Sequence, residues 1–241
     1  MPWAGWRSAA DTLIVYVAAL LLTAVVGSLI VLVVGGAPGR SQAGLVVLSP
    51  IALLVATIVW LRSRYGGGVR RVVGPAPLRW ADVGVGVGMG LACFLAGRIL
   101  LIGLVVLLER LGLDVPAVQD SFRVIAQDRA TAPALVVTAV LLAPVSEEFL
   151  FRGVLFQGVR ARTGFWPAAL ASAGMFTLAH VGDGGGPVAD LVIIAGILPL
   201  GVPFAAIMQW RGTVLASAVA HAVYNAGGVA LLILTSGAMN A

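Results

Sequence analysis

The chain has 241 residues, of which 60% are hydrophobic and only 10% are charged. A water-soluble domain of this size has too small an interior to hide so much apolar surface, so the composition indicates an integral membrane protein. All 15 basic residues are arginines and the net charge is +5. Because these arginines lie between apolar runs, we expect them to orient the chain in a membrane and not to bind nucleic acid. The lysine-free, alanine- and glycine-rich composition is typical of a GC-rich bacterial genome.

Seven apolar stretches are long enough to cross the hydrocarbon core as helices, which takes about 20 residues each. In chain order they are 12–34, 44–61, 83–108, 134–159, 166–181, 188–210 and 213–234. A short interfacial helix within 110–133 would make eight elements. The sequence therefore predicts an all-α fold, a polytopic bundle of 7–8 transmembrane helices, as a single integral membrane domain over residues 1–241.

The arginines are unevenly divided between the two ends of the predicted bundle. One end has Arg7, Arg62, Arg64, Arg70, Arg71, Arg79, Arg160, Arg162 and Arg211; the other has Arg40, Arg110, Arg123 and Arg129. The arginine-rich side of a membrane protein faces the cytoplasm. We therefore expect a multi-pass protein of the inner (plasma) membrane with a cytoplasmic N-terminus. With seven spans, the C-terminus lies outside.

Glycines are spaced regularly at the start of the third predicted span. Gly84, Gly86, Gly88 and Gly90 alternate with larger residues. Small residues four apart let membrane helices approach closely. We therefore expect this span to pack tightly against a neighbour.

Ionisable side chains gather inside three of the predicted spans, although each costs about 2.5–3.5 kcal/mol to insert at the bilayer centre. The polar residues concerned are Glu147, Glu148 and Arg152 in the fourth span, His180 in the fifth, and His221 and Asn225 in the seventh. They include both histidines and two of the three glutamates of the chain. Such a concentration marks a catalytic site or a transport pathway.

The spacing of these residues predicts which side chains face one another. Glu148 and Arg152 are four apart and can pair on one helix face, while Glu147 lies about 100° around the helix, free to face a different cavity. His221 and Asn225 are likewise four apart, as are Phe176 and His180.

A turn near Thr163 and Gly164 would join two antiparallel helices. Glu147 lies seventeen residues before Gly164 and His180 sixteen after it, so the turn brings the two side chains level, well within the bilayer. Pro144 would free a backbone carbonyl one turn before Glu147, which is tolerated only where protein or water replaces the lost hydrogen bond. The sequence thus predicts an intramembrane polar cavity.

Three motifs in this region resemble those of the CAAX-protease and bacteriocin-processing (CPBP) family of intramembrane proteases, related to the CAAX prenyl endopeptidase. The first motif is two glutamates, three residues and an arginine; the second is phenylalanine, three residues and histidine; the third is histidine, three residues and asparagine. All three occur in family order, as Glu147, Glu148 and Arg152, then Phe176 and His180, then His221 and Asn225. They lie in helices expected over 134–235, the catalytic core, whereas 1–133 carries no recognised motif.

The resemblance implies an enzyme that hydrolyses a peptide bond inside the membrane. Its catalytic residues would be Glu147 as the base that activates a water, His180 as its helper, and His221 with Asn225 as the groups that stabilise the oxyanion. Glu148 and Arg152 would support the helix and Phe176 would shape the pocket. The implied partners are membrane lipid and a membrane-embedded or lipidated peptide or protein substrate.

Metal dependence and function class both stay open on sequence grounds. Two histidines and a glutamate also form a familiar catalytic zinc set, here His180, His221 and Glu147, as in an intramembrane metalloprotease. Zinc would leave Asn225 without a role, so no cofactor is assigned. A proton-coupled small membrane transporter also places such groups at mid-membrane. A catalytically idle scaffold or a bacteriocin-immunity protein of the same fold is the third alternative.

Overall fold

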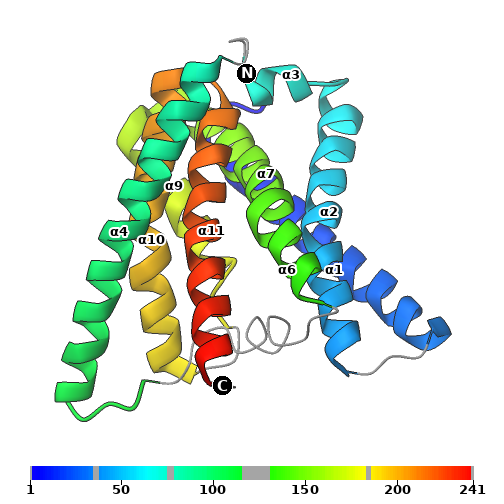
Figure 1. The fold of residues 1–241 in the computed structure, drawn as a ribbon. Helices are drawn as coiled ribbons and strands as arrows, with labels where there is room; N and C mark the ends of the chain where they lie inside the picture. Colours follow the sequence, from blue (N-terminus) through cyan, green and yellow to red (C-terminus); the bar gives the residue numbers. More distant parts are fainter. Residues whose placement is uncertain (1, 35–37, 75–78, 116–130, 183–185, 240–241) are drawn as a thin grey trace.

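The computed structural model describes residues 2–34, 38–74, 79–115, 131–182 and 186–239, and the elements within these ranges are helices (Figure 1). In chain order they are α1 (Arg7–Val34), α2 (Pro38–Tyr65), α3 (Val69–Val73), α4 (Trp80–Arg110), α6 (Ala132–Val137), η1 (Thr138–Leu142), α7 (Ala143–Glu148), η2 (Phe149–Phe156), α8 (Gln157–Thr163), α9 (Phe165–Leu178), α10 (Gly186–Arg211) and α11 (Val214–Met239). The elements α6 to α8 follow one another without a break and form a single long helix in which η1 and η2 are π-helical. The predicted all-α bundle is confirmed.

Among the described residues, six helices are long and apolar enough to cross a membrane, and they correspond to six of the seven predicted spans. The fifth predicted span, 166–181, differs in length. Its helix α9 has only 14 residues, about 21 Å at 1.5 Å per residue, against a hydrocarbon core of about 30 Å. Helix α9 therefore ends inside the bundle, just before His180. The short helix expected within 110–133 falls mostly on residues 116–130, outside the described residues.

The long helix α6–α8 is the centre of the bundle. It contacts α1, α2, α3, α9, α10 and α11, and every residue of its segment η2 is buried. A helix that is apolar on all sides must be surrounded by protein or lipid, and here the surrounding helices supply that cover. The residues on either side of η2 are therefore held in a fixed frame.

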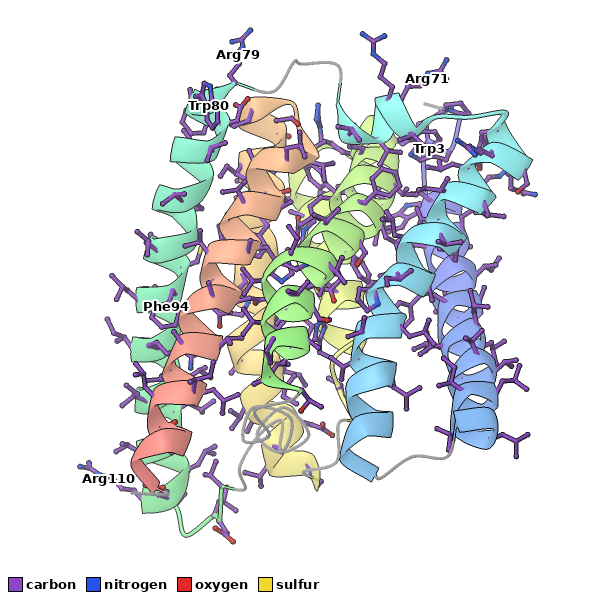
Figure 2. All side chains as sticks on the ribbon, turned by 45° about the vertical axis from the view of Figure 1, so that its right-hand side comes forward. Trp3, Arg71, Arg79, Trp80, Phe94 and Arg110 are labelled. Atoms are coloured by element: carbon purple, nitrogen blue, oxygen red, sulfur yellow. The ribbon has the colours of Figure 1, made fainter. Side chains whose placement is uncertain are left out.

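Three of the described arginines lie at the ends of the bundle to which the sequence assigns them. Arg71 and Arg79 lie at one end together with Trp3 and Trp80, and Arg110 lies at the other (Figure 2). Helix α1 begins at the end with Arg71, and α11 finishes at the opposite end (Figure 1). The described part of the chain thus starts and finishes at opposite ends of the bundle.

Helices α4 and α11 pack closely through two of the four glycines noted in the sequence. A Cβ atom on Gly86 would lie 2.8 Å from the Ala216 carbonyl oxygen, and one on Gly90 only 2.5 Å from the Ala220 carbonyl oxygen. Cβ atoms on Gly84 and Gly88 would have no neighbour within 4 Å. The tight contact therefore uses the pair that is four residues apart, while the other two glycines face outward.

This difference provides a stability prediction with its own control. Gly90→Val should push α11 away from α4 and destabilise the protein by about 1–3 kcal/mol, the usual penalty for overpacking. Gly88→Val, two residues away on the open face, should change stability by much less. Thermal unfolding of both variants in the same detergent measures the difference. Equal melting temperatures would contradict the close contact of α4 with α11.

Candidate active site

A cavity of about 640 Å³ lies inside the bundle, and the polar residues predicted from the sequence line it together. Its walls come from α1, α2, α4, the central helix, α9, α10 and α11. The sequence-predicted residues on its surface are Glu147, Phe176, His180, His221 and Asn225. Although 78 residues separate Glu147 from Asn225 in the sequence, the packing of the central helix against α11 brings them to one wall.

The carboxylate of Glu147 lies between the two histidine rings. Its Oε1 is 4.0 Å from His180 Nε2, and its Oε2 is 3.8 Å from His221 Nε2. Both distances are too long for direct hydrogen bonds. They leave room for a small group that contacts all three side chains, and the Glu147 side chain is 18% exposed. The predicted level placement of Glu147 and His180 is confirmed.

His180 is held at the end of α9 by backbone contacts. Its Nδ1 lies 2.8 Å from the Phe176 carbonyl oxygen. Since a carbonyl only accepts, Nδ1 carries a proton, and the singly protonated form of His180 would present an unprotonated Nε2 toward Glu147. The Tyr16 hydroxyl donates to the Ala179 carbonyl oxygen at 2.9 Å and so anchors the adjacent residue from α1.

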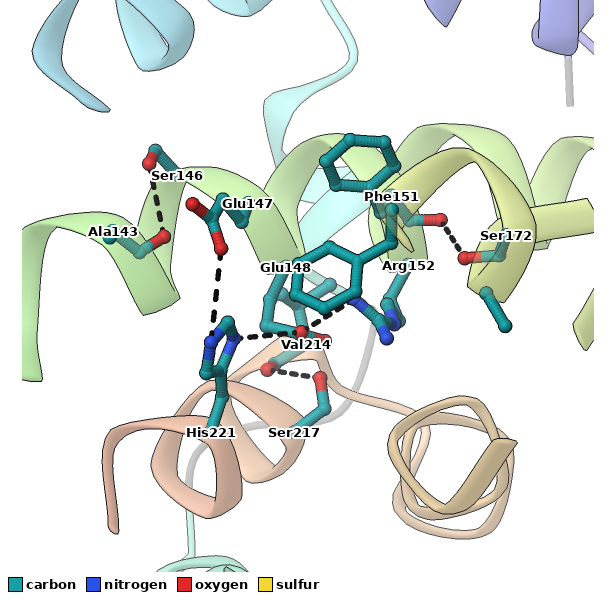
Figure 3. Close-up of polar contacts among 12 residues, drawn as sticks. Ala143, Ser146, Glu147, Glu148, Phe151, Arg152, Ser172, Val214, Ser217 and His221 are labelled. Atoms are coloured by element: carbon teal, nitrogen blue, oxygen red, sulfur yellow. Dashed lines mark hydrogen bonds and ion pairs between the residues drawn. The ribbon is translucent and has the colours of Figure 1, made fainter. Parts of the chain in front are cut away.

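His221 is fixed by a carboxylate and two aromatic rings. Its Nδ1 lies 3.2 Å from Glu148 Oε1 (Figure 3). The ring of Phe204, on α10, stacks on it with a centroid separation of 5.3 Å and an interplanar angle of 27°, and Phe176 meets it edge-on at 5.6 Å. Nε2 of His221 is consequently directed at Glu147.

Glu148 and Arg152 form the predicted pair, and both side chains are fully buried. Arg152 Nη1 donates to Glu148 Oε1 at 2.8 Å. The guanidinium carbon of Arg152 lies 4.5 Å from the centre of the Phe176 ring and 5.3 Å from the centre of the Phe204 ring. Glu148 thus holds both Arg152 and His221, while its neighbour Glu147 faces the cavity. The two glutamates face different surroundings, as their angular separation predicts.

Asn225 replaces the hydrogen bond that Pro144 cannot make. In the π-helical segment η1, the Ala143 N–H donates to the Thr138 carbonyl five residues earlier. The next N–H in this pattern would belong to Pro144 and would donate to Ala139, but proline has none. Asn225 Nδ2 donates instead to the Ala139 carbonyl oxygen at 2.8 Å. One of its two amide hydrogens is therefore in use, and the other remains for a ligand in the cavity.

A zinc site formed by Glu147, His180 and His221 is the alternative that the sequence leaves open. Glutamate oxygen and histidine nitrogen are both zinc ligands. However, the part of the chain that the structure describes contains no group of three or more histidine, cysteine, aspartate or glutamate side chains arranged to hold a metal ion. The Asn225 amide, already bound to Ala139, is not a usual zinc ligand either. We therefore derive no step through a metal.

Sequence reasoning missed four residues that form the cavity. Tyr16 and Phe204 position the two histidines, and Arg98 and Tyr224 line the cavity near Asn225. Arg98 carried a usable signal, because it is an arginine in the middle of an apolar span. Tyr16 and Phe204 carried none, since aromatic residues are common in any membrane helix.

The geometry agrees with the outcome of comparison with known proteins. A model of the family described as type II CAAX prenyl endopeptidase Rce1-like matches residues 129–227. No curated protein and no solved structure matches the chain. The matched segment contains Glu147, His180, His221 and Asn225 with the helices that position them. Residues 129–227 of this chain therefore resemble the Rce1-like family of CAAX prenyl endopeptidases.

Proposed function

We propose that this protein is an intramembrane endopeptidase in which Glu147 activates a water for attack on a peptide bond. The observation that supports this most directly is the position of the Glu147 carboxylate, 4.0 Å and 3.8 Å from the Nε2 atoms of two tethered histidines. The carboxylate and a neutral His180 both present acceptors to the space between them. A water has two hydrogens to donate, so it suits this space.

In the proposed first step, Glu147 takes a proton from the bound water while His180 Nε2 orients it through the second hydrogen. The oxygen attacks the carbonyl carbon of the substrate. General-base assistance of this kind contributes about 100-fold to 10,000-fold to a rate. The anchoring of His180 by Phe176 and Tyr16 fixes the direction of the water before the substrate arrives.

The attack places negative charge on the substrate oxygen, which needs donors. The free amide hydrogen of Asn225 is one donor, and Nε2 of doubly protonated His221 is the second. Glu148, whose Oε1 lies 3.2 Å from His221 Nδ1, accepts a hydrogen bond from that nitrogen and so holds the ring in this orientation. Fixed donors of this type stabilise an oxyanion without rearranging in the transition state.

In the last step, protonated Glu147 gives its proton to the leaving nitrogen, and the C–N bond breaks. The products are a carboxylic acid and an amine, and Glu147 returns to its starting form. One carboxylate thus serves first as base and then as acid. No second acid is required.

The substrate we propose is a membrane-embedded or lipidated peptide. The cavity opens within helices that lie in lipid, and its walls are largely leucine, valine, isoleucine, alanine and phenylalanine. Such walls bind apolar chain segments and exclude bulk water. The matched family is described as a CAAX prenyl endopeptidase, and a prenyl group has this apolar character.

The test is cleavage of lipidated and transmembrane peptides by the purified protein in water enriched in ¹⁸O. Hydrolysis should release two fragments and place one ¹⁸O atom in the new carboxyl group, as read by mass spectrometry. Absence of any cleavage, combined with proton flux across vesicles that contain the protein, would favour a transporter instead.

We also propose that the arginine-rich end, with Arg71 and Arg79, faces the cytoplasm of a bacterial plasma membrane. In a variant without Cys93, a cysteine at position 63 should react with an impermeant thiol reagent only in inverted vesicles. A cysteine at position 113, beyond Arg110, should react only from outside whole spheroplasts. The opposite pattern would invert the proposed topology.

A further inference from the structure

Arg98 is a cation in the middle of a membrane helix, outside the three motifs. It lies twelve residues before Arg110, the last residue of α4, which is about 18 Å along the helix. Its side chain lines the same cavity as Glu147. An arginine at this depth is rare and usually serves a polar pathway or binds a ligand.

The contacts of Arg98 with the described residues do not balance its charge. Its Nη2 donates to the Tyr224 hydroxyl at 3.4 Å, and its guanidinium lies 5.4 Å from the centre of the Phe94 ring. Its Nε is buried without a hydrogen-bond partner. Among the described residues, no carboxylate forms an ion pair with it. Arg152, by contrast, is neutralised by Glu148.

The direction of Arg98 argues against a simple contact with lipid headgroups. Long basic side chains near helix ends extend toward the interface. Arg98 instead reaches across to Tyr224 on α11. Gly97, the residue before Arg98 on α4, makes room for the Tyr224 ring, since a Cβ on Gly97 would lie 3.4 Å from that ring. The guanidinium is thereby held on the cavity wall.

Tyr224 adds a second donor at the same place. Its hydroxyl oxygen accepts from Arg98, so its own O–H remains to donate. Tyr224 precedes Asn225 and lies three residues after His221 on α11, within about 6 Å of either along the helix axis. A guanidinium with a neighbouring hydroxyl is a suitable receptor for a carboxylate.

We propose that Arg98 and Tyr224 bind a carboxylate of the peptide substrate and so determine which peptide bond reaches Glu147. This proposal rests on the proposed function, because it needs a peptide in the cavity. The carboxylate is either the C-terminus of the peptide or an acidic side chain close to the cleaved bond. Its negative charge balances Arg98 at a depth where neither charge is stable alone.

The experiment separates binding from turnover. Fluorescent lipidated peptides that end in a carboxylic acid or in a carboxamide are bound to Glu147→Gln protein in detergent, with and without Arg98→Gln. A second pair carries aspartate or asparagine beside the cleavage position. The Kd for the preferred acid should be about 10-fold to 100-fold lower than for its neutral partner, as expected for a charge-assisted hydrogen bond. Arg98→Gln should abolish this preference, and Tyr224→Phe should reduce it.

Arg110→Gln is the matched control, because it removes the same charge from the exposed end of α4, outside the cavity. It should leave the preference for the acid unchanged. Equal Kd values for acid and neutral peptides, or an equal loss of both in Arg98→Gln, would overturn the proposal. The proposal is also overturned if the acid and neutral peptides have equal Kd values while phosphatidylglycerol raises the Tm of the wild type but not of Arg98→Gln. The anion bound by Arg98 would then be a lipid phosphate. Because binding is measured without cleavage, a failure of hydrolysis would count against the proposed function alone.

Discussion

Glu147→Gln should lower the rate of peptide hydrolysis by about 100-fold or more, the usual scale for the loss of a general base. Glutamine has nearly the same shape as glutamate but cannot take a proton from water. Because Glu147 makes no hydrogen bond shorter than 3.5 Å to the histidines beside it, the fold should not depend on its charge. The melting temperature of the variant should therefore stay close to that of the wild type.

The measurement is kcat and KM for one fluorogenic lipidated peptide, alongside thermal unfolding in the same detergent. The effect should appear in kcat, since the lost interaction belongs to the transition state. A Glu147→Gln protein with wild-type kcat would refute the assignment of the base. A variant that fails to fold would show that Glu147 supports the bundle instead.

Glu148→Gln should, unlike Glu147→Gln, cause a large loss of stability. Glu148 and Arg152 are both fully buried and 2.8 Å apart, and removal of one partner leaves the other charge uncompensated. Breaking a buried pair from one side costs about 3–5 kcal/mol. His221 also loses the negative charge of its Nδ1 partner, so hydrolysis should fall together with the melting temperature.

Two further variants test this explanation. Replacing both Glu148 and Arg152 by neutral residues should recover part of the lost stability but little of the activity. Arg64→Gln is the control for an ordinary ion pair: Arg64 is 63% exposed and lies 3.8 Å from Asp11, so its loss should cost less than about 1 kcal/mol. A Glu148→Gln protein as stable as Arg64→Gln would show that the buried pair contributes nothing.

The sequence was most informative where a polar residue stood against an apolar background. Hydropathy alone predicts the long helices, since a span has few alternatives in lipid. The i, i+4 spacing predicts the pairing of Glu148 with Arg152, and the turn at Gly164, where φ is +84°, predicts that Glu147 and His180 lie level. These inferences depend on local geometry, which the sequence states directly.

Inferences that needed contacts between distant helices were incomplete. The hydropathy of 166–181 does not reveal that α9 stops after 14 residues, because chain enclosed by protein need not be helical. The missing hydrogen bond at Pro144 was predictable, but not that Asn225, 81 residues later, would supply it. Arg98 could be noticed as unusual, whereas its contact with Tyr224 depends on the crossing of α4 and α11.

The π-helical segment between Glu148 and α8 restricts how such a chain can change in evolution. Each π turn holds one residue more than the corresponding α turn, so deletion of a residue from Phe149–Phe156 allows an ordinary helix to form in its place. Any deletion beyond this extra residue would rotate the two glutamates by about 100° relative to the turn at Gly164. His180, which follows that turn, would then no longer meet Glu147. Point substitutions are therefore tolerated in this segment far more readily than insertions or deletions, and its length is inherited together with the site.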